Sequence, residues 1–180
     1  MDATDALLAT LPAHAEDLAY DLTKVLSEPR LEVAQRWGCA LASAISLRDR
    51  TLRDAFDRDA AAAGVAEATL EDARSAAALM AMTNVYYRFV DCAGGEYAQL
   101  PAALRMKRVA RPAGSQGDFE LFALAVSALS GCAACMRHHE ARGRAAGLTP
   151  LRLRDGVRIA ASVRGVSVAL WDQATAGGDL

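Results

Sequence analysis

Apolar residues recur three and four positions apart along most of the chain, and proline, glycine and short polar segments interrupt them. This spacing marks one face of a helix. Helix-forming residues dominate and runs of β-branched residues are scarce, so we expect an all-α protein. The predicted helices cover residues 7–11, 16–26, 31–47, 52–63, 70–90, 119–130, 132–146, 151–161 and 166–174, with loops at 91–99 and 111–115.

Two parts of the chain resemble each other in the order of their predicted elements, which is helix, helix, glycine, helix. This order indicates an internal duplication. We expect an N-terminal helical half (1–110) and a C-terminal helical half (111–180) that together form one compact unit. With one gap, the matched segments are 41–46 with 125–130, Gly64 with Gly147, 70–72 with 153–155, and 77–78 with 160–161.

The segment most informative about chemistry is Cys132-Ala-Ala-Cys135, which is followed by His139 and preceded by Glu120. Two thiols three positions apart lie on one helix face, close enough to form a disulfide. His139 falls along the same stripe. Residues 119–129 are apolar nearly all round, as in a buried helix, so a charge on Glu120 needs a partner, and His139 is the best nearby candidate. The pattern indicates thiol redox chemistry.

Ser130-Gly131 is expected to end the preceding helix, with Gly131 as a left-handed cap, so that a new helix begins at Cys132. The positive end of that helix would stabilise a thiolate, and helix geometry alone favours Cys132 as the more reactive thiol. In the aligned first half, Arg48 and Thr51 stand at the positions of the two cysteines. Only the second half is therefore expected to carry chemistry.

Composition narrows the functional classes. The net charge of −2 gives no strong field for nucleic acid or membrane, and no stretch offers about 18 uninterrupted apolar residues. The N-terminus lacks the pattern of a secretory signal, so we expect a cytoplasmic protein in which CxxC is redox-active or metal-binding. Four ligands within eight helical residues cannot easily converge on zinc, so we expect no metal. Cys39 and Cys92 are interpreted as plain apolar residues or surface thiols.

The four candidate residues and the sequence around them resemble the alkyl hydroperoxide reductase D (AhpD) proteins, within the carboxymuconolactone-decarboxylase-like superfamily. The resemblance runs from about Leu11 to about Leu170. It is carried by Glu120, Cys132, Cys135 and His139, together with Trp37-Gly38, 41–44, Asn84-Val85, Tyr87-Arg88, 104–106 and 125–129.

The resemblance implies an AhpD-like fold, a homotrimer, and a thiol-dependent peroxidase that reduces organic hydroperoxides. It implies that Cys135 is the peroxidatic cysteine, which becomes a sulfenic acid, and that Cys132 is the resolving cysteine and proton donor. The pair then forms the redox disulfide Cys132–Cys135. Glu120 and His139 would relay protons. No cofactor would be bound; dihydrolipoamide or a lipoylated protein would be the reductant, and the peroxiredoxin AhpC would be a partner.

Some members of that family carry a histidine where this chain has Ala134, which leaves open how many groups relay protons. His138 could contribute, although it projects about 100° away from His139 on the helix. Two alternatives remain: a non-peroxidatic disulfide carrier to a peroxiredoxin, and a carboxymuconolactone-decarboxylase-like enzyme, which needs no cysteine pair. The arginines of the second half indicate a solvated face or a docking surface for an acidic partner. They are Arg137, Arg142, Arg144, Arg152, Arg154, Arg158 and Arg164.

Overall fold

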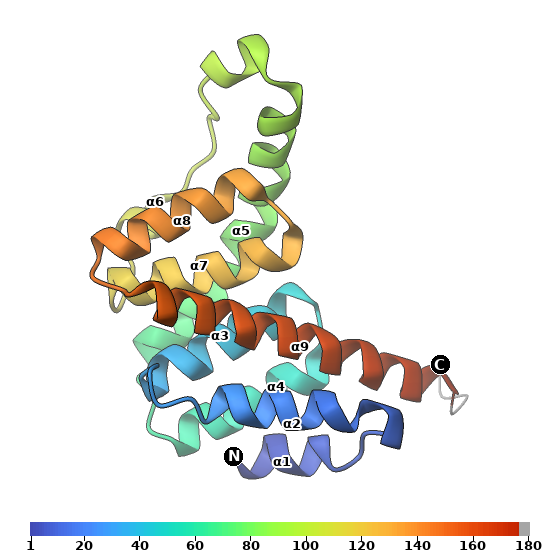
Figure 1. Ribbon diagram of the computed structural model, residues 1–180. Coiled ribbons are helices and arrows are strands. Elements are labelled where there is room, and N and C mark those ends of the chain that lie inside the picture. Colours follow the sequence, from blue (N-terminus) through green and yellow to red (C-terminus); the bar gives the residue numbers. More distant parts are fainter. Residues whose placement is uncertain (177–180) are drawn as a thin grey trace.

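The computed structural model describes residues 1–176, and within that range every regular element is helical, which confirms the all-α prediction (Figure 1). No helix of this range is both long and apolar enough to cross a membrane. The elements are α1 (Asp2–Leu8), η1 (Ala13–Ala15), α2 (Glu16–Leu26), α3 (Val33–Ser46), α4 (Arg50–Ala62), α5 (Glu67–Ala93), η2 (Gly95–Gln99), α6 (Lys107–Ala110), α7 (Gln116–Ser130), α8 (Ala133–Ala145) and α9 (Pro150–Ala176), where η marks a short 3₁₀ helix.

Three predicted elements differ clearly from the structure, and for two of them a contact with a distant segment outweighs local sequence. The first helix is α1 rather than 7–11, because the carboxylate of Asp59 accepts hydrogen bonds from the amides of Ala3 (3.0 Å) and Thr4 (2.8 Å). α9 is one helix rather than two, since Gly165 lies against Leu18 of α2 and the helix continues through it. α5 extends to residue 93, into the predicted loop 91–99, and η2 follows directly.

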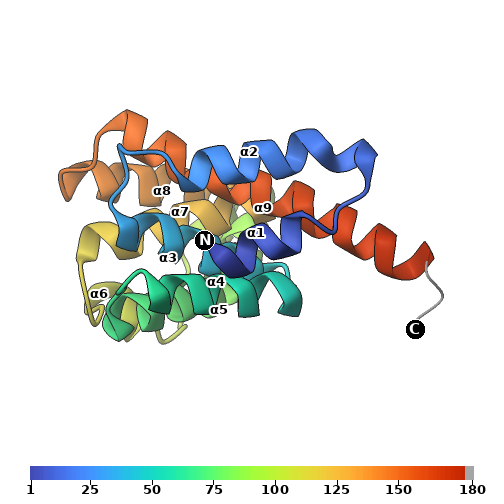
Figure 2. The ribbon, with the colours of Figure 1, turned by 90° about the horizontal axis from the view of Figure 1, so that it is seen from below.

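Helices α3, α5, α7 and α9 pack against one another and enclose a core that both halves of the chain share. α4 lies on α3, α8 on α7, α2 on α9 and α1 on α4. α1 and α2 lie on the side of the bundle away from α8, and the last turns of α9 extend beyond it (Figures 1 and 2). At Gly38 of α3 there is no room for a side chain, because a Cβ there would overlap the ring of Phe122 from α7.

The two halves have matching helices and reciprocal contacts. α3, α4 and α5 have 14, 13 and 27 residues, and α7, α8 and α9 have 15, 13 and 27. Buried Asp72 accepts hydrogen bonds from the amides of 113 and 114, just before α7, and buried Asp155 accepts one from Arg30, just before α3. These reciprocal contacts are what an internal duplication would produce. The boundary between the two halves at residues 110 and 111 stays a prediction.

The helix caps correct one detail of the alignment between the halves. Asp49 is the N-cap of α4 and accepts a hydrogen bond from the amide of Leu52, whereas Cys132 is the N-cap of α8 and accepts one from the amide of Cys135. The positions equivalent to the two cysteines are therefore Asp49 and Leu52, one residue later than the predicted Arg48 and Thr51.

The C-terminal part of α5 and η2 form an arm that projects from the bundle (Figure 1). Residues 100–110, which we call the strap, return from the arm and end in the short helix α6. On the arm, Phe89 and Tyr97 are exposed and their rings meet edge to face, with centroids 5.1 Å apart. The strap brings a second wall up to α8, and a pocket lies between them.

Candidate redox active site

The turn between α7 and α8 has the geometry that its sequence predicts. Gly131 adopts a left-handed conformation (φ 68°, ψ 25°) and Cys132 caps α8. The long helix α5 holds this turn from outside: Arg88 donates to the carbonyl of Ser130 at 2.8 Å, and Asn84 donates to its hydroxyl at 2.7 Å. Sequence reasoning had assigned Asn84 and Arg88 no role at the site.

Cys132 and Cys135 form a disulfide, with Cα atoms 5.3 Å apart. The two sulfurs have different surroundings. Cys132 is completely buried, while Cys135 lies at the wall of the pocket. No group of three or more His, Cys, Asp or Glu side chains within residues 1–176 is arranged to hold a metal ion.

Glu120 is fully buried near the start of α7 and accepts hydrogen bonds from three side chains. His139 Nδ1, Arg142 Nε and Gln116 Nε2 each lie 2.7 Å from one of its carboxylate oxygens. The predicted pairing of Glu120 with His139 is thus confirmed, and Arg142 and Gln116 are additional partners.

The charge state of Glu120 follows from these contacts. Burial alone would raise its pKa, but the hydrogen bonds from His139 and Arg142 outweigh burial, so the pKa lies below its ordinary value. An ionised carboxylate only accepts hydrogen bonds, so Nδ1 of His139 carries the proton when the imidazole is neutral. Nε2 is then the ring nitrogen that can accept a proton.

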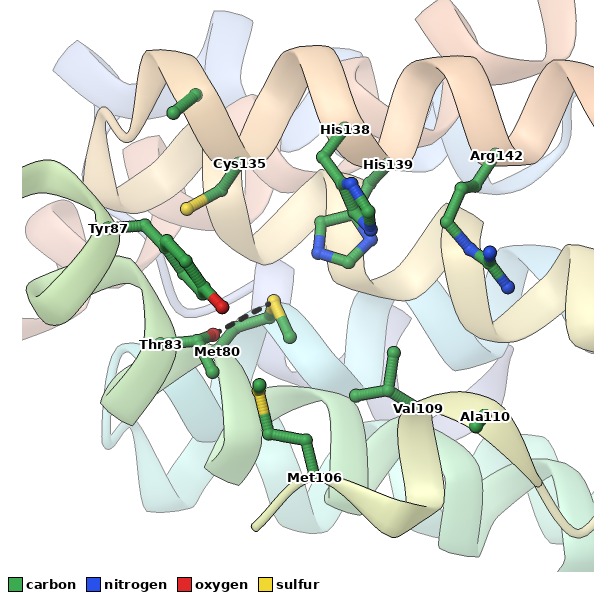
Figure 3. Close-up of a pocket in the computed structure, with 11 residues that line it drawn as sticks. Met80, Thr83, Tyr87, Met106, Val109, Ala110, Cys135, His138, His139 and Arg142 are labelled. Atoms are coloured by element: carbon green, nitrogen blue, oxygen red, sulfur yellow. Dashed lines mark hydrogen bonds between the residues drawn. The ribbon is translucent and has the colours of Figure 1, made fainter. Parts of the chain in front are cut away.

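A pocket of about 480 Å³ lies between α8, α5 and the strap (Figure 3). Its walls are mostly apolar, and its polar groups come chiefly from α8. The lining residues are Met80, Thr83 and Tyr87 from α5, Met106, Val109 and Ala110 from the strap, and Ala134, Cys135, His138, His139 and Arg142 from α8.

His138 contributes to this pocket despite its predicted direction. Its ring is only partly shielded from solvent and meets that of His139 edge to face, with centroids 5.1 Å apart. Burial, and then the neighbouring His139, lower the pKa of His138, so its ring is predominantly neutral near pH 7. Ala134 lines the same wall one turn earlier on α8.

Sequence reasoning missed Arg142 and Tyr87 as site residues. Arg142 follows Cys135 by seven positions and His139 by three, so helical spacing alone could have placed it on the stripe of the active residues. Tyr87 comes from a distant helix and gave no such signal. None of the seven arginines is buried, so the interpretation of the run as a solvated face holds, and most of its members form intramolecular ion pairs. These pairs join Arg137 to Asp91, Arg142 to Glu120, Arg152 to Glu32, and Arg154 and Arg158 to Asp155. Arg142 differs from the others because it pairs with a carboxylate of the site.

The other two cysteines lie away from this turn. Cys39 is buried, and burial strongly raises the pKa of its thiol, which makes it unreactive. Cys92 is exposed near the end of α5. These placements agree with the interpretations as an apolar residue and a surface thiol.

Comparison with known proteins agrees with this geometry. Residues 95–176 match the model of the carboxymuconolactone decarboxylase family. A protein of Anaeromyxobacter dehalogenans named alkyl hydroperoxide reductase AhpD is 48% identical over 171 residues, covering 94% of this chain and 91% of that protein. Proteins of the same name from Caulobacter vibrioides and Maricaulis maris are 42% and 41% identical, and each alignment covers more than nine-tenths of both chains. The chain belongs to the AhpD family of alkyl hydroperoxide reductases.

Proposed function

We propose that this protein reduces organic hydroperoxides with Cys135 as the attacking thiol and Cys132 as the resolving thiol. The observation that carries this assignment is the unequal access of the two sulfurs. Cys135 borders the pocket together with His139, whereas Cys132 is completely buried and does not line the pocket. A peroxide in the pocket therefore meets Cys135 first, even though Cys132 occupies the helix N-cap that favours a thiolate.

The first step transfers one oxygen atom. The Cys135 thiolate attacks the distal peroxide oxygen, the S–O bond forms as the O–O bond breaks, and the alkoxide leaves and takes a proton to become an alcohol. Cys132 then attacks the sulfenic acid on Cys135, and the disulfide forms as water leaves. The unlike surroundings of the two thiols support this division of roles.

In this scheme the proton moves through His139, and Glu120 orients it. Nε2 of His139 takes the proton from the Cys135 thiol, directly or through water, and returns it to the leaving alkoxide. Glu120 stays ionised and stabilises the imidazolium between these events. The three hydrogen bonds to Glu120 support an orienting role for its carboxylate.

A dithiol closes the cycle. Its first thiolate attacks the sulfur of Cys135, and Cys132 leaves as a thiolate that accepts from the amide of Cys135. The second thiol of the reductant then attacks its own sulfur in the mixed disulfide, which forms the oxidised, cyclic reductant and releases Cys135 as a thiolate. We propose dihydrolipoamide or a lipoylated protein as the reductant and the peroxiredoxin AhpC as a partner. The name of the relatives and the thiol chemistry support a reducing compartment, the cytoplasm.

We also propose that the protein acts as a homotrimer. The exposed apolar side chains of the arm support contact between copies of the chain, among them Val85, Phe89 and Tyr97. Sedimentation at micromolar concentration should give the mass of three chains, and Phe89→Glu should lower it. A stable monomer of the unchanged protein would contradict the assembly.

The test of the chemistry is a count of thiols after one equivalent of cumene hydroperoxide is added to the reduced protein. We expect rapid loss of two thiols, mapped to a Cys132–Cys135 bridge. Cys132→Ser should react once and hold a sulfenic acid that a dimedone probe labels at residue 135. If thiols disappear only when an oxidised peroxiredoxin is added, the protein is a disulfide carrier. If the probe labels Cys132 in Cys135→Ser, the two roles are exchanged.

A further inference from the structure

Arg142 has donor groups that the active site does not use. Its Nε donates to Glu120, while its two Nη groups have no hydrogen-bond or ion-pair partner within residues 1–176. The side chain is 46% exposed and lines the pocket, so these Nη groups remain accessible to a ligand. A guanidinium with a free edge is well suited to bind a carboxylate.

The Arg142 side chain and the Cys135 sulfur lie at different ends of the pocket. Cys135 and Arg142 lie seven residues apart on α8, about 10 Å along the helix axis. Figure 3 shows Cys135 toward one end of the pocket and Arg142 toward the other, with His138 and His139 between them. The facing wall comes from α5 and the strap and is mainly apolar, with Met80, Met106 and Val109 beside the hydroxyl-bearing Thr83 and Tyr87.

The charges around the pocket favour an anion at the Arg142 end. None of the lining residues is acidic, and Glu120, behind the wall, already accepts from three donors. Lys107 and Arg111 are exposed on either side of the lining residues Val109 and Ala110. Neither has an ion-pair partner among the side chains of the described range.

We propose that the pocket selects hydroperoxides that carry a carboxylate at the far end of a short apolar chain. Arg142 binds the carboxylate through its Nη groups, the chain lies along the apolar wall, and the hydroperoxide reaches Cys135. Arg142 is therefore a specificity-determining residue. The proposal rests on the proposed peroxidase function and narrows its substrate class to hydroperoxy acids.

The test compares short linear hydroperoxy acids with their methyl esters, which differ only in the charged end. The pre-reduced protein is mixed with each hydroperoxide in a stopped-flow instrument without added dithiol, so that the reductant cannot contribute. We expect the second-order rate constant for the acid to exceed that for the ester by roughly tenfold, the effect of one charge-assisted hydrogen bond. Arg142→Gln should bring this ratio close to one.

The ratio of the acid and ester rate constants distinguishes recognition of the carboxylate by Arg142 from the hydrogen bond between Arg142 and Glu120. Loss of that hydrogen bond would slow the reactions of the acid and the ester by the same factor, so the ratio would not change. Arg144→Gln is the matched control, because Arg144 is exposed on the same helix outside the pocket and should keep the wild-type ratio. Equal rates for acid and ester in the wild type, or a preference that persists in Arg142→Gln, would overturn the proposal. Loss of reaction with every hydroperoxide would instead contradict the peroxidase function.

A second measurement needs no variant. The parent carboxylic acids, which lack the hydroperoxide, should slow oxidation of wild-type protein by a neutral hydroperoxide, whereas their methyl esters should have at least fivefold weaker effects. Equal inhibition by acid and ester would contradict the assignment of Arg142 as the carboxylate-binding group.

Discussion

Replacement of Glu120 by glutamine tests the hydrogen-bond network most directly, because it changes one oxygen into an NH₂ group and leaves the shape intact. The carboxylate faces three donors: Gln116 and Arg142 at one oxygen, and His139 at the other. The amide keeps two of these bonds when its oxygen faces Arg142 and its NH₂ faces His139. Nδ1 of His139 must then accept, so the ring proton moves to Nε2.

This change of tautomer sets the expected magnitude. With Nε2 protonated, His139 cannot take the proton of Cys135. Loss of a general base costs about 10²-fold to 10⁴-fold, and the analogous substitution in a serine protease triad, which also traps the wrong tautomer, costs about 10⁴-fold. We expect the rate constant for oxidation of reduced Glu120→Gln by cumene hydroperoxide to fall by at least about 10²-fold near neutral pH.

The assay is stopped-flow oxidation of the pre-reduced protein, with thiol counting to confirm the product. Glu140→Gln is the matched control, since Glu140 is exposed on α8 and does not line the pocket. Denaturant unfolding of both variants verifies that each is folded, and we expect Glu120→Gln to lose about 1–3 kcal/mol because a charged hydrogen-bond network is weakened. A rate constant within about threefold of the wild type in folded Glu120→Gln would refute the orienting role of the carboxylate.

Two further predictions concern stability. Gly38→Ala should lower the free energy of unfolding by about 1–3 kcal/mol or more, since the new methyl group would overlap Phe122 where α3 meets α7; denaturant unfolding measures this, and an unchanged midpoint would contradict the close approach. Burial would raise the pKa of Asp155, but hydrogen bonds from Arg30, Arg154 and Arg158 outweigh it and hold the pKa below its ordinary value. The stabilisation from Asp155 is therefore present above the unfolded pKa of about 3.9 and is lost as pH falls through the folded pKa. The free energy of unfolding of Asp155→Asn should accordingly fall less steeply between about pH 5 and pH 2 than that of the wild type. The same dependence on pH in both proteins, measured by denaturant unfolding, would contradict this.

Sequence reasoning succeeded where the physical cause is local. The left-handed Gly131, the cap at Cys132 and the shared helical stripe of Cys135 and His139 depend only on neighbouring residues, and the structure has all of them. Glu120 could be paired with His139 because a buried carboxylate requires a partner and few candidates lay nearby.

The parts that sequence reasoning missed depend on contacts between distant segments. The start of α1 is fixed by Asp59, more than fifty residues away, and the continuity of α9 through Gly165 by its packing on α2. Tyr87 reaches the pocket only because α5 passes beside α8. Arg142 was locally predictable, but the surrounding run of arginines concealed its separate role.

The bracing of the catalytic turn by α5 has a consequence for the fate of the enzyme under excess peroxide. Asn84 and Arg88 fix Ser130, and the cap of α8 fixes Cys132, so the turn has little conformational freedom to lose when the two sulfurs join. A preorganised nucleophile has a high effective molarity toward its neighbour. In the proposed mechanism, capture of the sulfenic acid by Cys132 should therefore compete well against a second peroxide molecule, which would convert Cys135 to the irreversible sulfinic acid. If Cys135 is the attacking thiol, as proposed, two side chains on a neighbouring helix would thus help to determine how many turnovers the enzyme completes before overoxidation inactivates it.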